Sequence, residues 1–323
     1  MENIKKSQKN GQILSFFVIF SFILLIICNI KSSIVSVKNA LFVWTENLVP
    51  ALFPLSFFTA ILSFSDSYNF LIKSLGSILN KIFGVNYICG YVFFISVLCG
   101  YPTASSIIGD YVKRGFITRR QGEKMLTVCT FAGPLFTIGT VGVTFYDDIH
   151  LGIIIYVIHF ISVILSGLLL KRFMVDKDPD SQVQNAFSGN IFYDSMIKAI
   201  TNMFIVGGYV VIFSVISDIL FSFDFVNRLL FSVAGKVNCD YTLLRGIFCG
   251  ILEMTTGLNF VAKSIVNIKI RLIISSVIIS FGGFSVMLQS LSLFPCRKKI
   301  FILYKLFVTL ITVCVSVIIM SFI

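Results

Sequence analysis

The chain has 323 residues, of which 57% are hydrophobic and 13% are charged, and its formal net charge is +11. Apolar runs of about 18 residues or more recur along the chain, which is the pattern of membrane-spanning helices and excludes a soluble globular domain. The basic residues lie scattered in short loops between these runs, so the charge bias of membrane-protein loops explains them better than nucleic-acid binding does. The eight cysteines and two histidines form no metal-ligand pattern, so we expect neither a metal nor a cofactor.

Backbone polar groups in hydrocarbon must be paired within the chain, which leaves helix bundles and closed barrels. The apolar runs are continuous and do not alternate, so we expect an all-α integral membrane protein, a polytopic helix bundle. Lys5, Lys6 and Lys9 precede the first apolar run at 13–30. No small-residue cleavage site follows this run, so we expect a retained transmembrane helix and not a signal peptide.

Residues 32–47 mix apolar side chains with Lys38, Trp44 and Glu46. This mixture predicts an amphipathic helix at the membrane interface, with Trp44 at the level of the lipid headgroups. Pro50 then opens the next apolar run, where a proline near a helix start costs little because that amide has no intrahelical partner.

Gly100, Tyr101 and Pro102 interrupt the next apolar segment at its centre. Two short apolar arms around such a break predict a re-entrant hairpin, because irregular backbone at membrane depth is tolerated only where protein or a water-filled cavity covers it. A single kinked helix is the alternative. Thr118 and Gln121 have the spacing of a capping box, which predicts a helix start.

Gly133 and Pro134 break the helix that follows, and residues 151–170 form an uninterrupted span that contains His159. Residues 171–190 are the one long polar stretch, rich in Asp, Ser, Asn and Gln, and they read as a linker between two halves of the chain.

The order of features repeats beyond this linker, at an offset of about 150 residues. Gly207 and Gly208 interrupt the first apolar run, a break follows at 253–257, and Gly282 and Gly283 interrupt the next helix. Broken segments at corresponding positions of two halves indicate a transporter whose site lies at the bilayer midplane. We therefore expect two repeats of inverted topology, with chance similarity between apolar segments as the alternative. The expected domains are an N-terminal transmembrane helix at 1–31, a first repeat at 32–170, a linker at 171–190 and a second repeat at 191–323.

Helix N-termini at these breaks carry free amides and partial positive charge, which suits anionic groups. Glu253 is the only carboxylate close to a break, and ionisable groups inside membrane segments are functional candidates. Because it would repel an anion, we expect Glu253 to be protonated, to pair with Arg245 or Lys263, or to bind a coupling cation. His159 is either a proton relay or a hydrogen-bonding partner of a neighbouring helix.

The candidate substrate-binding residues share a position at or just after a break, and they are Tyr101, Thr103, Ser105, Ser106, Glu253, Thr255, Thr256, Asn259 and Gln289. The expected helix-break residues are Gly100, Pro102, Gly133, Pro134, Gly257, Gly282 and Gly283. The hydroxyls of Thr103, Ser105 and Ser106 have an alternative role, since Ser and Thr side chains often bond to their own helix backbone.

Five segments together make the chain resemble a known family: NLVPALFPLSFF at 47–58, CGYPTASSI at 99–107, RGFITRRQGEKML at 114–126, FAGPLFTIGTVG at 131–142 and GILEMTTGLN at 250–259. They resemble the sporulation integral membrane proteins of spore-forming Firmicutes (stage V sporulation protein V, YlbJ type), which are built on nucleoside-recognition (Gate) domains. Ala104, Ala132 and Gly133 depart from the pattern expected of that family.

The resemblance implies a multi-pass cell-membrane transporter that moves dipicolinic acid from the mother cell toward the forespore, across the outer forespore membrane. A nucleoside or related metabolite transporter is one alternative, with Glu253, Asn259 and Gln289 bound to sugar hydroxyls and base edges. A non-transporting scaffold in a sporulation complex is the other.

We expect no enzyme, because no nucleophile, base and orienting residue occur as a set. The expected partners are the lipid bilayer and a small anionic or nucleoside-like solute, with no nucleic acid. A homo-oligomer or a sporulation membrane partner is left open.

Overall fold

The computed structural model describes residues 2–64, 70, 72–171 and 189–323. This part of the chain is helical and contains no strand. Five helical segments in it are long and apolar enough to span a membrane: Ile30–Ser63, Ile149–Leu170, Ile191–Ser222, Ile268–Leu293 and Lys298–Phe322. The expected all-α polytopic membrane protein is confirmed. The predicted linker at 171–190 lies almost wholly outside the described residues.

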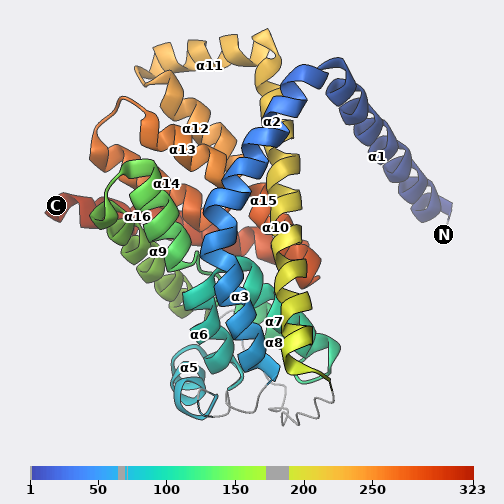
Figure 1. Ribbon diagram of the computed structural model, residues 1–323, viewed down its shortest axis with the longest axis vertical. Helices are drawn as coiled ribbons and strands as arrows, with labels where there is room; N and C mark the ends of the chain where they lie inside the picture. The colour runs from blue at the N-terminus through green and yellow to red at the C-terminus, as the bar shows by residue number, and fades with distance from the viewer. Residues whose placement is uncertain (1, 65–69, 71, 172–188) are drawn as a thin grey trace.

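The first half of the chain contains α1 (Glu2–Cys28), α2 (Ile30–Val43), η1 (Trp44–Leu48), α3 (Val49–Phe64), η3 (Ile72–Gly76), α5 (Ser77–Phe83), α6 (Cys89–Cys99), α7 (Tyr101–Lys113), α8 (Arg119–Leu126), η4 (Leu135–Phe145) and α9 (Ile149–Leu170). The second half contains α10 (Ile191–Ser222), α11 (Asp224–Val237), α12 (Tyr241–Leu252), α13 (Met254–Lys263), α14 (Ile268–Phe281), α15 (Gly283–Leu293) and α16 (Lys298–Phe322). The η segments are π-helical. Helix α1 extends away from the other helices (Figure 1).

The expected interfacial helix at 32–47 is wrong, because α2, η1 and α3 follow one another as one long helix. Trp44 is half-buried and packs against Gly207 of α10, where a Cβ atom would lie 2.6 Å from the indole ring. Helix α10 is continuous through Gly207 and Gly208. Gly207 permits a close contact between two helices and does not end one.

Helix α3 and helix α10 run in opposite directions. In Figure 1 the chain descends through α2 and α3 and ascends through α10. The contacts agree, since Ser36 of α2 donates to Asp218 late in α10, whereas Trp44 meets Gly207 earlier in α10. Each helix is followed by a short helix, a helical hairpin, a broken helix and a final span. The two halves therefore have opposite orientations, as inverted repeats do, while the boundaries of the two Gate-like repeats stay predictions.

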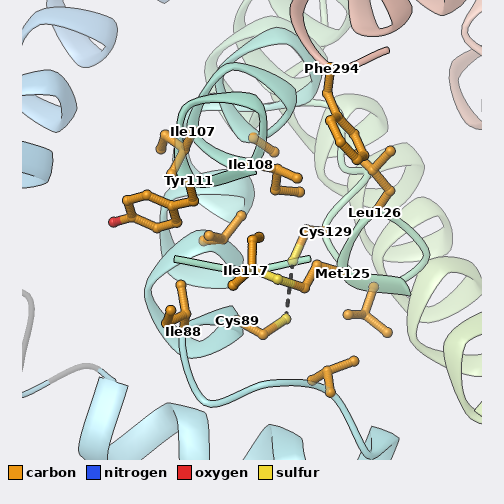
Figure 2. Close-up of a cluster of buried hydrophobic side chains, with 14 of the residues drawn as sticks. Ile88, Cys89, Ile107, Ile108, Tyr111, Ile117, Met125, Leu126, Cys129 and Phe294 are labelled. Atoms are coloured by element: carbon orange, nitrogen blue, oxygen red, sulfur yellow. Dashed lines mark hydrogen bonds between the residues drawn. The ribbon is translucent and has the colours of Figure 1, made fainter. Parts of the chain in front are cut away.

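Helices α6 and α7 form the first hairpin. They join at Gly100, whose φ of +86° is open to glycine and strained for other residues. Figure 2 shows Ile88 and Cys89, at the start of α6, in one apolar cluster with Tyr111, near the end of α7, so the chain folds back on itself. Arms of 11 and 13 residues reach about 20 Å, which is less than the ~30 Å hydrocarbon core. The hairpin is therefore re-entrant, as the break at Gly100 predicts.

Helices α12 and α13 form the second hairpin, with Glu253 at its tip. Its arms are so close that a Cβ atom on Gly257 would overlap the backbone of Gly250, and one on Gly246 would lie 2.8 Å from Val261. Gly257 is thus an interior residue of α13 that lets the arms touch. The expectation that it breaks a helix is wrong, because the break lies at Glu253.

Each broken helix touches the hairpin of its own half. Gly133, in the segment before η4, lies against the backbone of Cys99, to which its Cβ atom would come within 3.1 Å. Gly282 and Gly283 separate α14 from α15 with φ angles of +81° and +67°. A Cβ atom on Gly283 would lie 2.9 Å from the carbonyl oxygen of Gly250. In each half, the tip of the hairpin is therefore in contact with the break of the interrupted helix.

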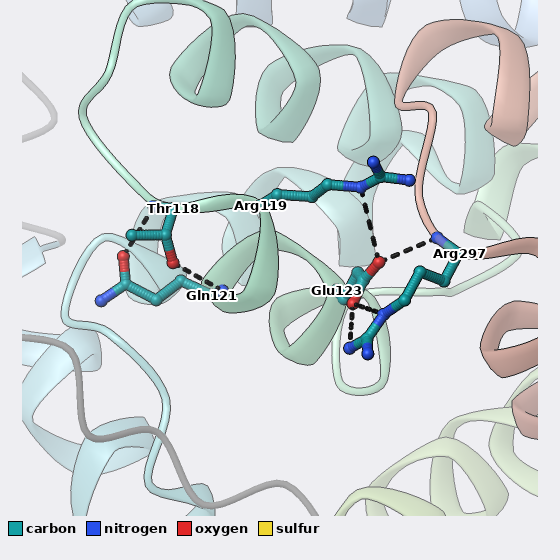
Figure 3. Close-up of polar contacts among 5 residues, drawn as sticks. All are labelled: Thr118, Arg119, Gln121, Glu123 and Arg297. Atoms are coloured by element: carbon teal, nitrogen blue, oxygen red, sulfur yellow. Dashed lines mark hydrogen bonds and ion pairs between the residues drawn. The ribbon is translucent and has the colours of Figure 1, made fainter.

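An ion pair joins the two halves on the side of α8, opposite α11 (Figure 1). Helix α8 begins with the expected capping box, in which Thr118 and Gln121 bond reciprocally through their side chains and backbone amides (Figure 3). One turn later Glu123, whose side chain is 5% exposed, accepts hydrogen bonds of 2.8 Å from the backbone N and the Nε of Arg297. Arg119 lies 3.7 Å from the same carboxylate.

Replacing Glu123 by Gln should destabilise the protein by about 2 kcal/mol, since hydrogen bonds to charged groups contribute about 1.5–3 kcal/mol. Thermal unfolding in detergent measures the loss. The matched control is Arg119→Gln, because Arg119 is 58% exposed and exposed pairs contribute about 0–1 kcal/mol. Equal losses in both variants would contradict this account of the contact with Arg297.

Gly257→Ala should also destabilise the fold, because overpacking at a close contact costs about 1–3 kcal/mol. Gly208→Ala is the control: no atom lies within 4 Å of a Cβ placed there, and alanine is favoured over glycine inside a helix by about 0.5–1 kcal/mol. The same unfolding assay should give shifts of opposite sign. A neutral Gly257→Ala would show that the arms of the second hairpin are not in contact.

Candidate functional site

The hairpin tips and the broken helices border one central cavity of about 40 Å³. Its polar lining residues are Tyr101, Glu253, Thr255 and Gln289, and the others are apolar residues of the hairpin tips, α10, α15, η4 and the segment before it, and the helix formed by η1 and α3. A water molecule needs about 10–15 Å³ of such space. The cavity is therefore large enough for water but not for a metabolite, which can enter only if its walls move apart.

A second cavity of about 450 Å³ lies between α2, η4, α10 and α13. Val210 and Thr255 border both cavities, so we call the larger one the vestibule of the central cavity. It lies on the side of α12 and α13, whereas the ion pair of Glu123 and Arg297 lies on the side of α8 (Figure 1). Its polar lining residues are Ser36, Asn39, Asn47, Thr144, Ser214, Asp218, Thr255, Thr256, Asn259 and Lys263.

Glu253 is the N-terminal cap of α13. Its two carboxylate oxygens accept hydrogen bonds from the backbone amides of Thr255, at 2.9 Å, and Thr256, at 2.6 Å. Free amides and the helix dipole stabilise a negative charge at this position, which explains an acid that is only 1% exposed. The expectation that these amides are free for a substrate anion is wrong, because the protein's own carboxylate occupies them.

The first hairpin has no such acid at its tip. Gly100 lacks a side chain, and α7 begins without a side-chain cap, with Pro102 in its first turn. Thr103, Ser105 and Ser106 follow in α7; they are buried and line neither cavity. The two tips therefore differ in charge, although they occupy corresponding places in the two halves.

Tyr101 and Lys305 satisfy the carbonyl groups that the break in α14 leaves free. The hydroxyl of Tyr101 donates to the carbonyl of Ile279, and Nζ of Lys305 donates to the carbonyl of Ser280 at 2.9 Å. The last carbonyls of a helix have no intrahelical partner. The Lys305 ammonium also lies 4.3 Å from the centre of the Tyr101 ring, within the range of a cation–π contact.

His159 of α9 satisfies the other break. Its Nε2 accepts a hydrogen bond of 3.0 Å from the amide of Ala132, in the segment before η4. Its Nδ1 lies 2.8 Å from the hydroxyl of Ser280, which also accepts from Thr312 at 2.8 Å. An amide N–H can only donate, so Nε2 carries no proton and the ring is the neutral Nδ1–H tautomer. One chain of hydrogen bonds thus connects the two broken helices.

Lys305 and Ser280 are not among the residues predicted from the sequence. Lys305 stands inside the final apolar run, where an ionisable residue is a functional candidate by default. That signal was available, whereas nothing local marks Ser280. The structure brings Tyr101, Glu253, Thr255 and Gln289 to the central cavity, and Thr255, Thr256 and Asn259 to the vestibule.

Comparison with known proteins adds one relative. The chain is 25% identical over 295 residues to the sporulation integral membrane protein YlbJ of Bacillus subtilis (strain 168), a match that covers 82% of this chain and 71% of the relative. No protein-family model matches the chain, and no solved structure does. The Gate domains stay a prediction. The similarity to YlbJ supports assigning this integral membrane protein to the YlbJ-type family of sporulation membrane proteins.

Proposed function

We propose that this protein is a transporter and not an enzyme, and that its solute passes between the two hairpin tips. The observation that carries the proposal is the meeting of two hairpins and two broken helices, from halves of opposite orientation, at one central cavity. Secondary transporters with inverted repeats bind their solutes at such a place. The small cavity suits a state closed around the pathway, with the vestibule as the route from one side.

We propose further that the solute is a small anion, with dipicolinic acid as the first candidate, moved toward the forespore across the outer forespore membrane. The resemblance to sporulation membrane proteins supports a role in sporulation. The charges of the groups near the central cavity support an anionic solute. Lys305 places a buried amine, which attracts an anion when it is protonated, behind Tyr101. The uncapped start of α7 at Gly100 adds partial positive charge. The carboxylate of Glu253 is bound to its own helix, which reduces its repulsion of an anion.

A nucleoside is the second candidate, because Glu253 and Gln289 put a carboxylate and an amide at the central cavity. Such groups bind sugar hydroxyls and base edges. A scaffold that transports nothing is the remaining alternative. It would recruit a sporulation membrane partner through its surface and would not depend on the cavity.

Uptake into proteoliposomes tests the pathway. The wild-type protein should take up labelled dipicolinate, with saturation, in preference to labelled uridine. Leu52→Trp should reduce uptake at least about tenfold, because Leu52 lines the central cavity and an indole would fill it. Leu303→Trp is the matched control, since Leu303 is 65% exposed on α16. Uptake of uridine without uptake of dipicolinate would contradict the assignment of dipicolinate as the solute. Unchanged uptake by Leu52→Trp would show that the pathway does not pass through the central cavity.

Glu253→Gln separates the two solutes. If the solute is an anion, loss of this negative charge should lower the KM for dipicolinate by on the order of tenfold, which corresponds to about 1.4 kcal/mol. If the solute is a nucleoside, the same change should raise the KM for uridine, because a hydrogen-bond acceptor is lost. The measurement is the concentration dependence of uptake for both solutes. An unchanged KM for each would remove Glu253 from the binding site.

A further inference from the structure

His159 is fully buried and holds a wall of the central cavity in place. Its exposed fraction is 0%, and its partner Ala132 lines the cavity together with Gly133. The hydrogen bond from the Ala132 amide to Nε2, 3.0 Å long, ties this wall to α9. On its other side the ring is bound to Ser280, close to the break in α14. The imidazole therefore contacts both broken helices, one through each nitrogen.

The groups that face the ring come from four directions. Tyr101 of α7 lies 6.1 Å away between ring centres, and Phe131 presents an edge at 6.2 Å. Ser280 of α14 bonds to Nδ1, and Lys305 of α16 bonds to the carbonyl of the same serine. The titratable groups around His159 are thus Tyr101 and Lys305, and neither is a carboxylate.

A proton on Nε2 is incompatible with this arrangement. The protonated nitrogen and the Ala132 amide would be two donors facing each other at 3.0 Å. The amide would lose its partner, and the imidazolium would repel Lys305 whenever that amine is protonated. Each effect opposes protonation as long as the wall stays where it is. Proton binding and the contact between His159 and Ala132 therefore exclude each other.

We propose that His159 is the proton-binding site that couples this transporter to a pH gradient. A proton taken up from water forms the N–H bond at Nε2, and the hydrogen bond from Ala132 breaks. The segment before η4 is then free to move and widen the cavity. Loss of the proton restores the contact and closes it. The inference rests on the proposed transport function, and it names the driving ion of that function.

His159→Gln is the decisive variant. The amide oxygen of Gln can accept from Ala132 and its NH2 group can donate to Ser280, but this side chain does not titrate. In proteoliposomes with a more acidic exterior, the wild-type protein should accumulate dipicolinate up to about tenfold per pH unit for each coupled proton. Uptake by His159→Gln should no longer follow the gradient. Gradient-driven accumulation by this variant at the wild-type level would overturn the proposal.

His150→Gln is the matched control, because His150 is exposed at the start of α9 and is the only other histidine of the chain. It should behave like the wild type. A thermal unfolding midpoint close to that of the wild type, measured for both variants, shows that each is folded.

A readout without solute separates this proposal from the proposed function. Trp44, the only tryptophan, packs on Gly207 of α10, next to Val206 of the cavity wall. Its fluorescence should change with pH in the wild type and in His150→Gln but not in His159→Gln. If this difference is seen while neither dipicolinate nor uridine enters the liposomes, the result supports the proton site and contradicts the assignment of the solute. If the pH response is absent, or equal in all three proteins, the proton site falls whatever the uptake shows.

Discussion

Every backbone amide and carbonyl inside a membrane needs a partner, because the bilayer core offers no water to replace one. Each interrupted helix in a bundle leaves backbone amides or carbonyls without an intrahelical partner. In the interior of this protein, side chains form hydrogen bonds with these groups. Glu253 serves the amides of α13, His159 serves the amide of Ala132, and Tyr101 and Lys305 serve the last carbonyls of α14. These polar side chains bond to backbone groups at the helix breaks, and because the breaks lie beside the cavity, the side chains do as well.

Much of the architecture could be predicted from the sequence, because length and hydropathy decide which segments span a bilayer. The Gly-Tyr-Pro break and the capping box at Thr118 were also readable, since each has a local cause. The errors concern residues whose role depends on a neighbour. Trp44 suits a headgroup as well as a helix contact, and only the position of α10 beside it decides between them.

The candidate site divides in the same way. The bonds of Glu253 to amides two and three residues later are local, and a Glu-Met-Thr-Thr sequence at a helix start could have predicted them. The contact of His159 with Ser280 joins residues 121 positions apart, and that of Lys305 with Tyr101 joins the two halves. No spacing rule reaches such pairs. Contacts within one helix turn can therefore be assigned from the sequence, whereas contacts across the bundle cannot.

The unequal hairpin tips have a further consequence. In a transporter with two identical halves of opposite orientation, the form open to one side of the membrane and the form open to the other would have equal free energies. The two forms would then be equally populated. Here one tip ends in Gly100 and the other in Glu253, which carries a charge and two extra hydrogen bonds. If the protein transports as proposed, this difference between the tips contributes to a preferred resting form even when no gradient acts on the molecule.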